Sequence, residues 1–190
     1  MPHFIAARFG IFVFLLVLFA GPILSAPARA EPFDPSTFDP AAPPAFLFGE
    51  SVEAHEAVFA AECSAQTLQT FDPAEMPLAE ISHEQVDCEG FAYYGAPRLA
   101  EFVFVDGALT HVWVLTGAED LAGMRAAFEA AFGTPDHNVE GMFTTFIGHG
   151  AVVRYDIPEA LYFAEAVTPA FAAWFDGMAE EAATNIQSAE

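Results

Sequence analysis

The 190-residue chain contains no lysine, and its five basic residues are all arginines. They are outnumbered by 27 aspartates and glutamates, so the formal net charge is −22 and the isoelectric point is about 4.2. Nucleic acids and anionic membranes are bound through clustered cations, so both are excluded as sequence-independent partners. Intrinsic disorder is excluded too, because 54% of the residues are hydrophobic and 21 are phenylalanine. This composition predicts one compact domain.

The sequence motifs of common enzymes are also missing. The chain has no G-x-S-x-G nucleophile turn, no glycine-rich loop for phosphates or dinucleotides, and no acidic calcium loop. Two segments, 55–59 and 83–87, approach the H-E-x-x-H zinc motif. Phe59 cannot bind a metal, and 83–87 is expected beside or within a strand, where residues four apart are separated by more than about 12 Å. We therefore predict no catalytic residue, no cofactor and no metal ligand, although an acid-rich chain leaves a catalytic pair of carboxylates open.

Residues 1–30 have the pattern of a secretory signal peptide. Arg8 gives the positively charged start, Ile11–Ala20 is an unbroken apolar run, and Ala28–Ala30 matches the small-x-small cleavage pattern. The alternative is an uncleaved anchor, but Gly21-Pro22 interrupts the run before the roughly 18–20 apolar residues that a membrane-spanning helix needs. We expect a periplasmic or secreted protein with no stable membrane insertion. The mature chain then keeps three arginines against 27 acidic residues, a formal charge of −24.

Cys63 and Cys88 are the only two cysteines. In an oxidising compartment such a pair within one small domain forms a structural disulfide. The chain-entropy model assigns a closed loop of this length roughly 3–4 kcal/mol of stabilisation. The alternative, a catalytic or metal-binding thiol pair, would favour C-x-x-C spacing or histidines at ligand spacing, and the chain has neither.

The mature chain divides into three regions. Residues 31–48 are rich in proline and predict an extended leader, whose phenylalanines can still pack on the domain. Residues 49–176 predict a single α+β domain. Residues 177–190 predict a polar C-terminal tail.

The clearest helix is predicted at 117–132. Thr116 and Glu119 form a capping box at its start, and Gly133 ends it. Another helix is predicted from Val52 to about Cys63. The remaining segments are a short helix at 170–175 and strands at 81–91, 99–105, 108–115, 141–147, 151–156 and 160–165.

Asp106-Gly107 predicts a tight hairpin turn between two of these strands. Side chains along a strand point alternately to the two faces of the sheet, so the residues of the two strands that flank this turn can be assigned to faces. One face is expected to carry Phe102, Phe104, Leu109, His111, Trp113 and Leu115. The other is expected to carry Val103, Val105, Val112 and Val114.

The order of elements favours an α+β fold, an antiparallel sheet with helices on one face. A second arrangement is two helix-plus-hairpin halves in tandem, at about 49–115 and 116–166. In element order alone, this outline resembles the tandem modules of secreted β-lactamase inhibitor proteins and the helix-then-sheet domain of small envelope assembly factors. That resemblance concerns the fold and implies no function.

Tyr93, Tyr94 and Arg98 form a candidate partner-binding site. They lie in a loop bounded by glycine and proline, just beyond Cys88, and tyrosine and arginine are enriched in binding hot spots. The alternative is that the two rings cover the edge of the sheet. Arg154 is expected to pair with a nearby carboxylate.

A second cluster consists of Asp136, His137, Glu140 and His149. If these residues converge at one end of the sheet, they can bind a transition metal. The alternative is a solvated loop in a chain where acidic neighbours are frequent, and this alternative is preferred.

The leading hypothesis for function is an exported acidic α+β domain that acts as a non-enzymatic binding or protein-interaction module. One alternative is an envelope hydrolase that uses paired carboxylates or a metal near residues 136–149. Another is an inhibitor or assembly factor for a basic envelope protein, because electrostatic attraction accelerates such encounters.

Overall fold

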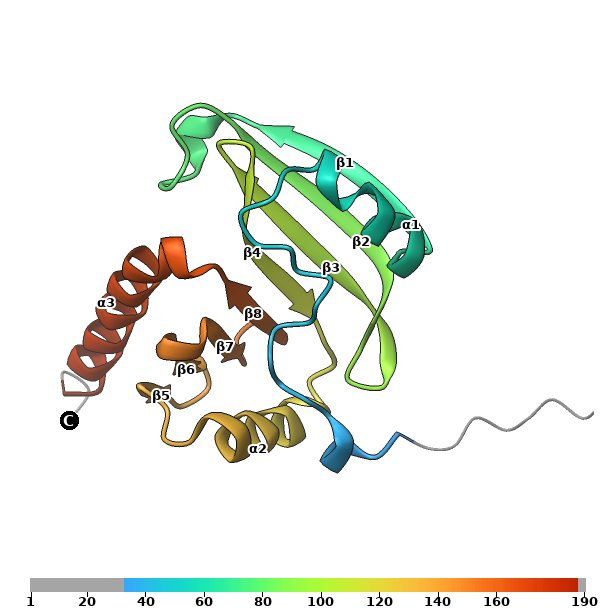
Figure 1. Cartoon of the computed structure of the whole chain (residues 1–190). Coiled ribbons are helices and arrows are strands. Elements are labelled where there is room, and N and C mark those ends of the chain that lie inside the picture. Colours follow the sequence, from blue (N-terminus) through green and yellow to red (C-terminus); the bar gives the residue numbers. More distant parts are fainter. Residues whose placement is uncertain (1–32, 188–190) are drawn as a thin grey trace, which may run out of the picture. The chain divides into compact units, whose positions relative to one another are not determined.

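A computed structural model describes residues 33–187 of the chain (Figure 1). The predicted signal peptide, residues 1–30, lies outside the described residues. The α+β class is confirmed: one open antiparallel sheet of eight strands has three α-helices packed against it. No helix within residues 33–187 is long and apolar enough to cross a membrane.

The elements follow one another in two similar series. The first consists of α1 (Glu56–Glu62), β1 (Ala65–Phe71), β2 (His83–Tyr93), β3 (Ala96–Val105) and β4 (Ala108–Leu115). The second consists of α2 (Leu121–Phe132), β5 (His137–Val139), β6 (Phe143–Phe146), β7 (Ala151–Arg154) and β8 (Glu159–Phe163). Helix α3 (Thr168–Gln187) ends the described chain.

Each series is a helix followed by four antiparallel strands, so the expected tandem arrangement is present with four strands in each half. The strand order across the sheet is β1-β2-β3-β4-β8-β7-β6-β5. The last strands of the two halves, β4 and β8, therefore pair with each other, with Val112 opposite Tyr162 and Trp113 opposite Leu161. The two halves share one continuous sheet.

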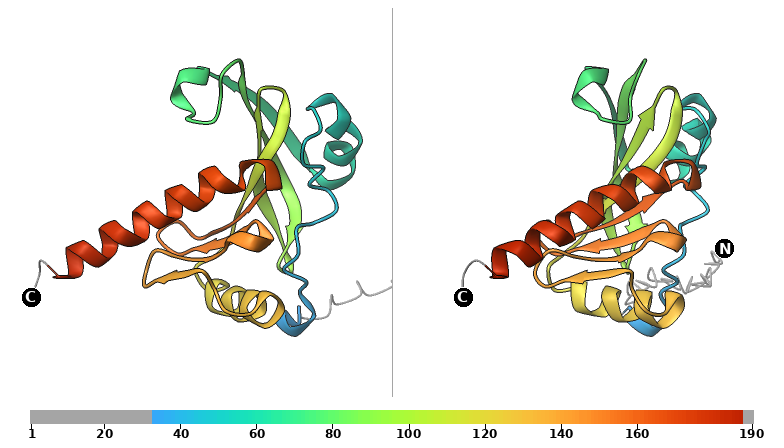
Figure 2. Two further views of the ribbon diagram at one scale, coloured as in Figure 1. Left: turned by 60° about the vertical axis from the view of Figure 1, so that its left-hand side comes forward. Right: turned by 90° about the vertical axis from the view of Figure 1, so that its left-hand side faces the viewer.

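The sheet has two differently covered faces. Helices α1 and α2 pack on the face that carries Phe102 and Tyr162, which we call the paired-helix face. Helix α3 packs on the opposite face, against Leu161 and Phe163, which we call the α3 face. The left view of Figure 2 shows α1 and α3 on opposite sides of the strands. The expected position of the helices thus holds for α1 and α2, whereas α3 covers the second face because that face is also apolar in the β5–β8 half.

The hairpin between β3 and β4 has the predicted turn but not the predicted faces. Asp106 and Gly107 both have positive φ values, 53° and 80°, as a tight hairpin turn requires. Beyond the turn the register shifts, so that Phe104 pairs with Leu109 while Val103 pairs with His111. This bulge inserts one extra residue, Thr110, and every later side chain of β4 changes face.

The bulge corrects the sequence-based assignment of β4. Val112 and Val114 lie on the paired-helix face with Phe102. His111 and Trp113 lie on the α3 face, contrary to the prediction. The bulge therefore directs one histidine and one tryptophan away from the main aromatic core.

The described part of the predicted leader, residues 33–48, packs against the sheet. Phe46 is buried, and its ring centroid lies 5.5 Å from that of Phe91 and 5.4 Å from that of Phe102. The buried Tyr162 hydroxyl donates a hydrogen bond to the Pro40 carbonyl oxygen at 3.1 Å. The leader phenylalanines thus contribute to the core on the paired-helix face, as the sequence allowed.

The start of helix α2 differs from the prediction, whereas its end agrees with it. Helix α2 begins at Leu121, and its Asp120 N-cap makes no side-chain cap hydrogen bond. The expected capping box is absent: the Thr116 hydroxyl is buried with no hydrogen-bond partner within the described residues. Gly133 ends the helix as predicted, with φ of 86°.

Helix α3 is longer than the short helix expected at 170–175. It continues to Gln187, so residues 177–187 of the predicted polar tail are helical. Strands β1 and β5 were not predicted.

Candidate functional site

An apolar groove lies on the α3 face, where helix α3 leaves part of strand β4 uncovered. Its volume is ≈ 500 Å³. Three segments that are distant in sequence form it: the loop between β1 and β2, strand β4, and the first two turns of α3. The lining residues are Met76, Pro77, Leu78, His111, Trp113, Ala170, Phe171 and Trp174.

Four of the eight lining residues carry aromatic rings. The bulge in β4 places His111 and Trp113 on this face, and the 3.6-residue period of α3 places Phe171 and Trp174 on one side of the helix. The ring centroids of His111 and Phe171 are 5.2 Å apart, and those of Trp113 and Trp174 are 6.4 Å apart. Trp174 is 41% exposed, so its ring forms part of the groove opening.

The loop that supplies Met76–Leu78 is held by the β3–β4 turn. The Asp106 carboxylate accepts hydrogen bonds from the backbone N–H groups of Ile81 at 2.7 Å and Ser82 at 3.0 Å. These bonds lower the pKa of the Asp106 carboxyl. The hairpin turn therefore also positions one wall of the groove.

His111 keeps the groove floor uncharged. Burial, with a smaller contribution from the charge of His83, lowers the pKa of His111 to about 3. Its Nδ1 atom is 2.9 Å from the Thr110 hydroxyl. A neutral imidazole beside Trp113 and Phe171 makes this floor suited to apolar ligands.

Trp113 connects the groove to charged groups on the same face. The Arg154 guanidinium carbon lies 5.5 Å from the Trp113 ring centroid, within the range of a cation–π interaction. Arg154 also pairs with Asp156 and with Glu159, each at 2.8 Å. The predicted pairing of Arg154 with a local carboxylate is confirmed.

Two carboxylates lie in line with Trp113 on the next two strands of the sheet. Glu101 on β3 is directly opposite Trp113, and Asp87 on β2 is directly opposite Glu101. Directly opposed residues share a face, so both side chains lie on the α3 face beside the groove. The Asp87 carboxylate accepts hydrogen bonds from the amide groups of Gln69 and Gln85. We call Glu101 and Asp87 the carboxylate pair.

Two carboxyl groups near Trp113 are harder to ionise than usual. Burial raises the pKa of Glu101, and the Asp87 charge adds to the effect. Burial also raises the pKa of Glu159 to about 7, against the opposing effect of Arg154 and with a contribution from Glu101. The Glu159 side chain is only 7% exposed and bound to Arg154, so it is shielded from a substrate.

The predicted disulfide is present: Cys63 and Cys88 are bonded, with Cα atoms 5.1 Å apart. Cys63 caps the C-terminal end of α1, and Cys88 is fully buried in β2. The bond attaches α1 to the sheet on the paired-helix face. A disulfide is consistent with an extracytoplasmic protein.

The candidate partner-binding residues Tyr93, Tyr94 and Arg98 lie close together but are largely covered. The two tyrosines are 4% and 6% exposed. The Phe38 ring of the leader packs against both, at 5.2 Å and 5.0 Å between centroids. Arg98 forms an ion pair with Asp120. In this arrangement the tyrosine rings cover the sheet and do not offer a free surface to a partner.

Three of the four residues of the 136–149 cluster make separate local contacts, and the fourth, Glu140, is exposed. Asp136 accepts a hydrogen bond from the Ile147 backbone N–H at 2.6 Å. His137 contacts Asp176 of α3 at 2.7 Å. His149 stacks on Phe132 with 4.3 Å between ring centroids. Across residues 33–187, no three His, Cys, Asp or Glu side chains are grouped to hold a metal ion.

The histidines of the two zinc-like segments also have structural contacts. His55 is fully buried, and its ring stacks on Phe59 with 5.6 Å between centroids. His83 lies in β2, as expected, with its ring 4.8 Å from that of Phe71.

The groove itself was not predicted. His111 and Trp113 were assigned to the other face, and Trp174 was counted only as part of an apolar stretch. One usable signal was present in β3: Glu101 alternates with Val103 and Val105, so a charged residue occupies an otherwise apolar face. Another was the i, i+3 spacing of Phe171 and Trp174 at the start of a helix.

Comparison with known proteins identifies no relative: the chain matches no family model, no curated protein and no solved structure.

Proposed function

We propose that this protein is an exported, periplasmic or secreted, binding module without enzymatic activity, and that the groove is its binding site. The observation that carries the proposal is the position of the tryptophans. The chain has two, Trp113 and Trp174, and both line the groove. Tryptophan is enriched among the residues that dominate binding energies.

The chemistry of the groove fits binding. Ligand sites are typically concave and mostly apolar, with a few polar groups that fix the orientation of the ligand. Here the walls are aromatic or aliphatic, the one imidazole is neutral, and the charged Arg154 and Glu101 lie beside Trp113. An apolar side chain or small apolar ligand suits such a groove.

Binding of Nile red, an uncharged apolar dye, tests the proposal. We expect saturable binding with a blue shift of the dye emission and quenching of tryptophan fluorescence, which here arises only from the groove.

Two variants of α3 provide a matched comparison. Ala170→Phe fills the groove and is expected to weaken dye binding by about tenfold or more, because the space for the ligand is lost. Ala173→Phe adds the same ring at an exposed position that does not line the groove, and should leave binding unchanged. Absence of saturable binding, or an equal effect of both substitutions, would contradict the proposal.

A further inference from the structure

The groove opens onto acidic surface at one side. Its wall residue Trp113 is one strand away from Glu101 and two strands away from Asp87. Neighbouring strands are about 4.8 Å apart. When one side chain of a ligand occupies the groove, the adjacent residues of that ligand can therefore reach the carboxylate pair. The apolar and the acidic surfaces therefore form one continuous strip across β4, β3 and β2.

The carboxylate pair is an unfavourable arrangement for the protein alone. Like charges directly opposite each other on a sheet destabilise it, and Glu101 and Asp87 are such a pair. Both side chains are partly buried. Within residues 33–187, the Glu101 carboxylate makes no ion pair and no hydrogen bond, while Asp87 receives only neutral amide donors.

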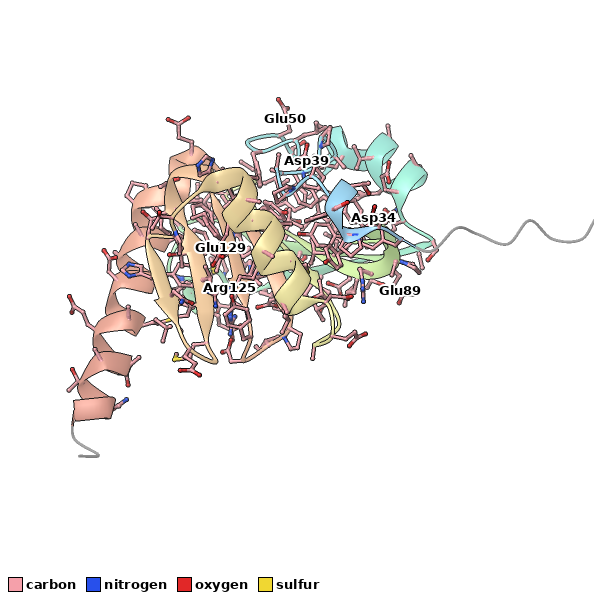
Figure 3. The ribbon with its side chains drawn as sticks, turned by 90° about the horizontal axis from the view of Figure 1, so that it is seen from below. Asp34, Asp39, Glu50, Glu89, Arg125 and Glu129 are labelled. Atoms are coloured by element: carbon pink, nitrogen blue, oxygen red, sulfur yellow. A yellow bond between two sulfur atoms is a disulfide. The ribbon has the colours of Figure 1, made fainter. Side chains whose placement is uncertain are left out.

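The described residues offer no unpaired arginine for this pair. The chain has no lysine, and the arginines of the described part are each in an ion pair. These pairs are Arg98–Asp120, Arg125–Glu129 and Arg154 with Asp156 and Glu159. Figure 3 shows Arg125 and Glu129 together on α2, which packs on the paired-helix face, opposite the carboxylate pair. Within residues 33–187, every arginine is therefore engaged elsewhere, and a partner protein can supply the cation that neutralises the carboxylate pair.

We infer that the groove binds a cationic amphipathic segment of a partner protein, with an apolar side chain in the groove beside Trp113 and Trp174 and a neighbouring lysine or arginine on the carboxylate pair. This inference rests on the proposed function and names its partner class. The net charge of −24 expected for the mature chain accelerates encounters with a basic partner. A second copy of this chain is disfavoured as the partner, because it carries the same excess of negative charge.

Three short peptides test the two parts of this inference separately. The first is acetyl-Ser-Phe-Lys-Phe-Lys-Ser-amide, which has both chemistries. In the second, glutamine replaces both lysines, and in the third, serine replaces both phenylalanines. Binding is measured by tryptophan fluorescence and calorimetry at low and high sodium chloride. We expect the first peptide to bind about tenfold more tightly than either of the others at low salt, with most of the advantage over the glutamine peptide lost at high salt.

Substitutions in the carboxylate pair locate the charge effect. Asp87→Asn together with Glu101→Gln keeps the side-chain shapes and removes both charges. The advantage of the lysine peptide over the glutamine peptide should disappear, while Nile red binding stays unchanged. The matched control is Glu56→Gln with Glu62→Gln, which changes the net charge equally at exposed sites on α1, on the opposite face. In this control variant, the lysine peptide should still bind more tightly than the glutamine peptide.

Each outcome separates the inference from the proposed function. If Nile red binds but lysine gives no advantage, the inference is wrong and the binding module stands. If neither the dye nor any peptide binds, the proposed function is wrong as well. If the α1 control removes the advantage as fully as the carboxylate variant does, attraction is a property of total charge and the assigned site is overturned. Equal binding of the peptide without phenylalanine would overturn the role of the groove.

Discussion

The two faces of the sheet are closed in different ways. On the paired-helix face, α1, α2 and the leader together enclose an aromatic core in which Phe102, Phe128 and Tyr162 are completely buried. On the α3 face, one helix covers the β5–β8 half, and the groove remains where its first turns meet β4. Aromatic residues therefore have different roles on the two faces. Aromatic rings on the first face stabilise the fold, and those at the groove are available to a ligand.

Truncation of Phe102 is expected to give the largest loss of stability. Its ring is fully buried and packs against Phe46, Phe59 and Phe91. Phe102→Ala should lower the free energy of unfolding by about 3–5 kcal/mol, which chemical denaturation measures. Phe102→Leu keeps more of the volume and should cost less. Equal effects of the two substitutions would show that this face is less tightly packed than the burial indicates.

Loss of the disulfide should have the next largest effect. Cys63→Ala with Cys88→Ala opens the covalent loop and is expected to cost roughly 2–4 kcal/mol, seen as a lower melting temperature. A reducing agent should lower the melting temperature of the natural protein and leave that of the variant unchanged. Detection of two free thiols in the exported protein would contradict the bond.

The charge of Glu159 should make stability depend on pH. The pKa of Glu159 rises from 4.5 to about 7 on folding, so the folded protein binds this proton more tightly than the unfolded chain does. Its contribution is complete below pH 4.5 and is lost as the pH rises to about 7. The free energy of unfolding should fall by on the order of 2 kcal/mol over this interval, with a smaller contribution of the same sign from Glu101.

Glu159→Gln is the variant that isolates this effect. Denaturation curves between pH 4.5 and 8 should show a reduced slope in this variant, because the amide does not titrate. Glu165→Gln, at an exposed position, serves as the control and should keep the slope. A natural protein whose stability is constant over the interval would contradict the assignment.

Trp174→Ala should have the smallest effect on stability and a large effect on binding. Because Trp174 is 41% exposed, its loss should cost less than about 1–2 kcal/mol of unfolding free energy. Its neighbour Phe175 is fully buried against Phe143, so Phe175→Ala should cost about 3–5 kcal/mol. Denaturation and Nile red titration of both variants check the contrast. If Trp174→Ala binds the dye normally, the groove is not the binding site.

Local chemistry explains which features the sequence could predict. The Asp106-Gly107 turn depends on residues that tolerate positive φ, and the disulfide depends on there being two cysteines. Both are properties of short segments or of residue counts. The α+β class likewise followed from the order of segments with helical and strand patterns.

The groove depends on contacts that no short segment reveals. The bulge at Thr110 that directs Trp113 into it is held by distant partners. The Thr110 carbonyl accepts a hydrogen bond from the Ala164 N–H at 2.8 Å, and Leu109 exchanges backbone hydrogen bonds with Gly49 and Glu50. Alternation within the strand could not anticipate these bonds, so the faces of β4 were assigned incorrectly.

Strand β1 was missed for a different reason. Its sequence, AQTLQTF, has no apolar alternation, because it is an edge strand and most of its side chains are exposed on both faces. Helix α3 was shortened in the prediction because its second half is polar, although a solvent-exposed helix needs few apolar residues.

The pairing of β4 with β8 has a consequence for folding order. Within each half, neighbouring strands are close in sequence, whereas Val112 and Tyr162 must meet across a much longer stretch of chain. Because closing a long loop costs more entropy than closing a short one, we expect the two four-stranded halves to form before the joint between them. The groove draws its walls from both sides of that joint, so it exists only in the completely assembled sheet. A ligand that fills it therefore stabilises the last step of folding selectively.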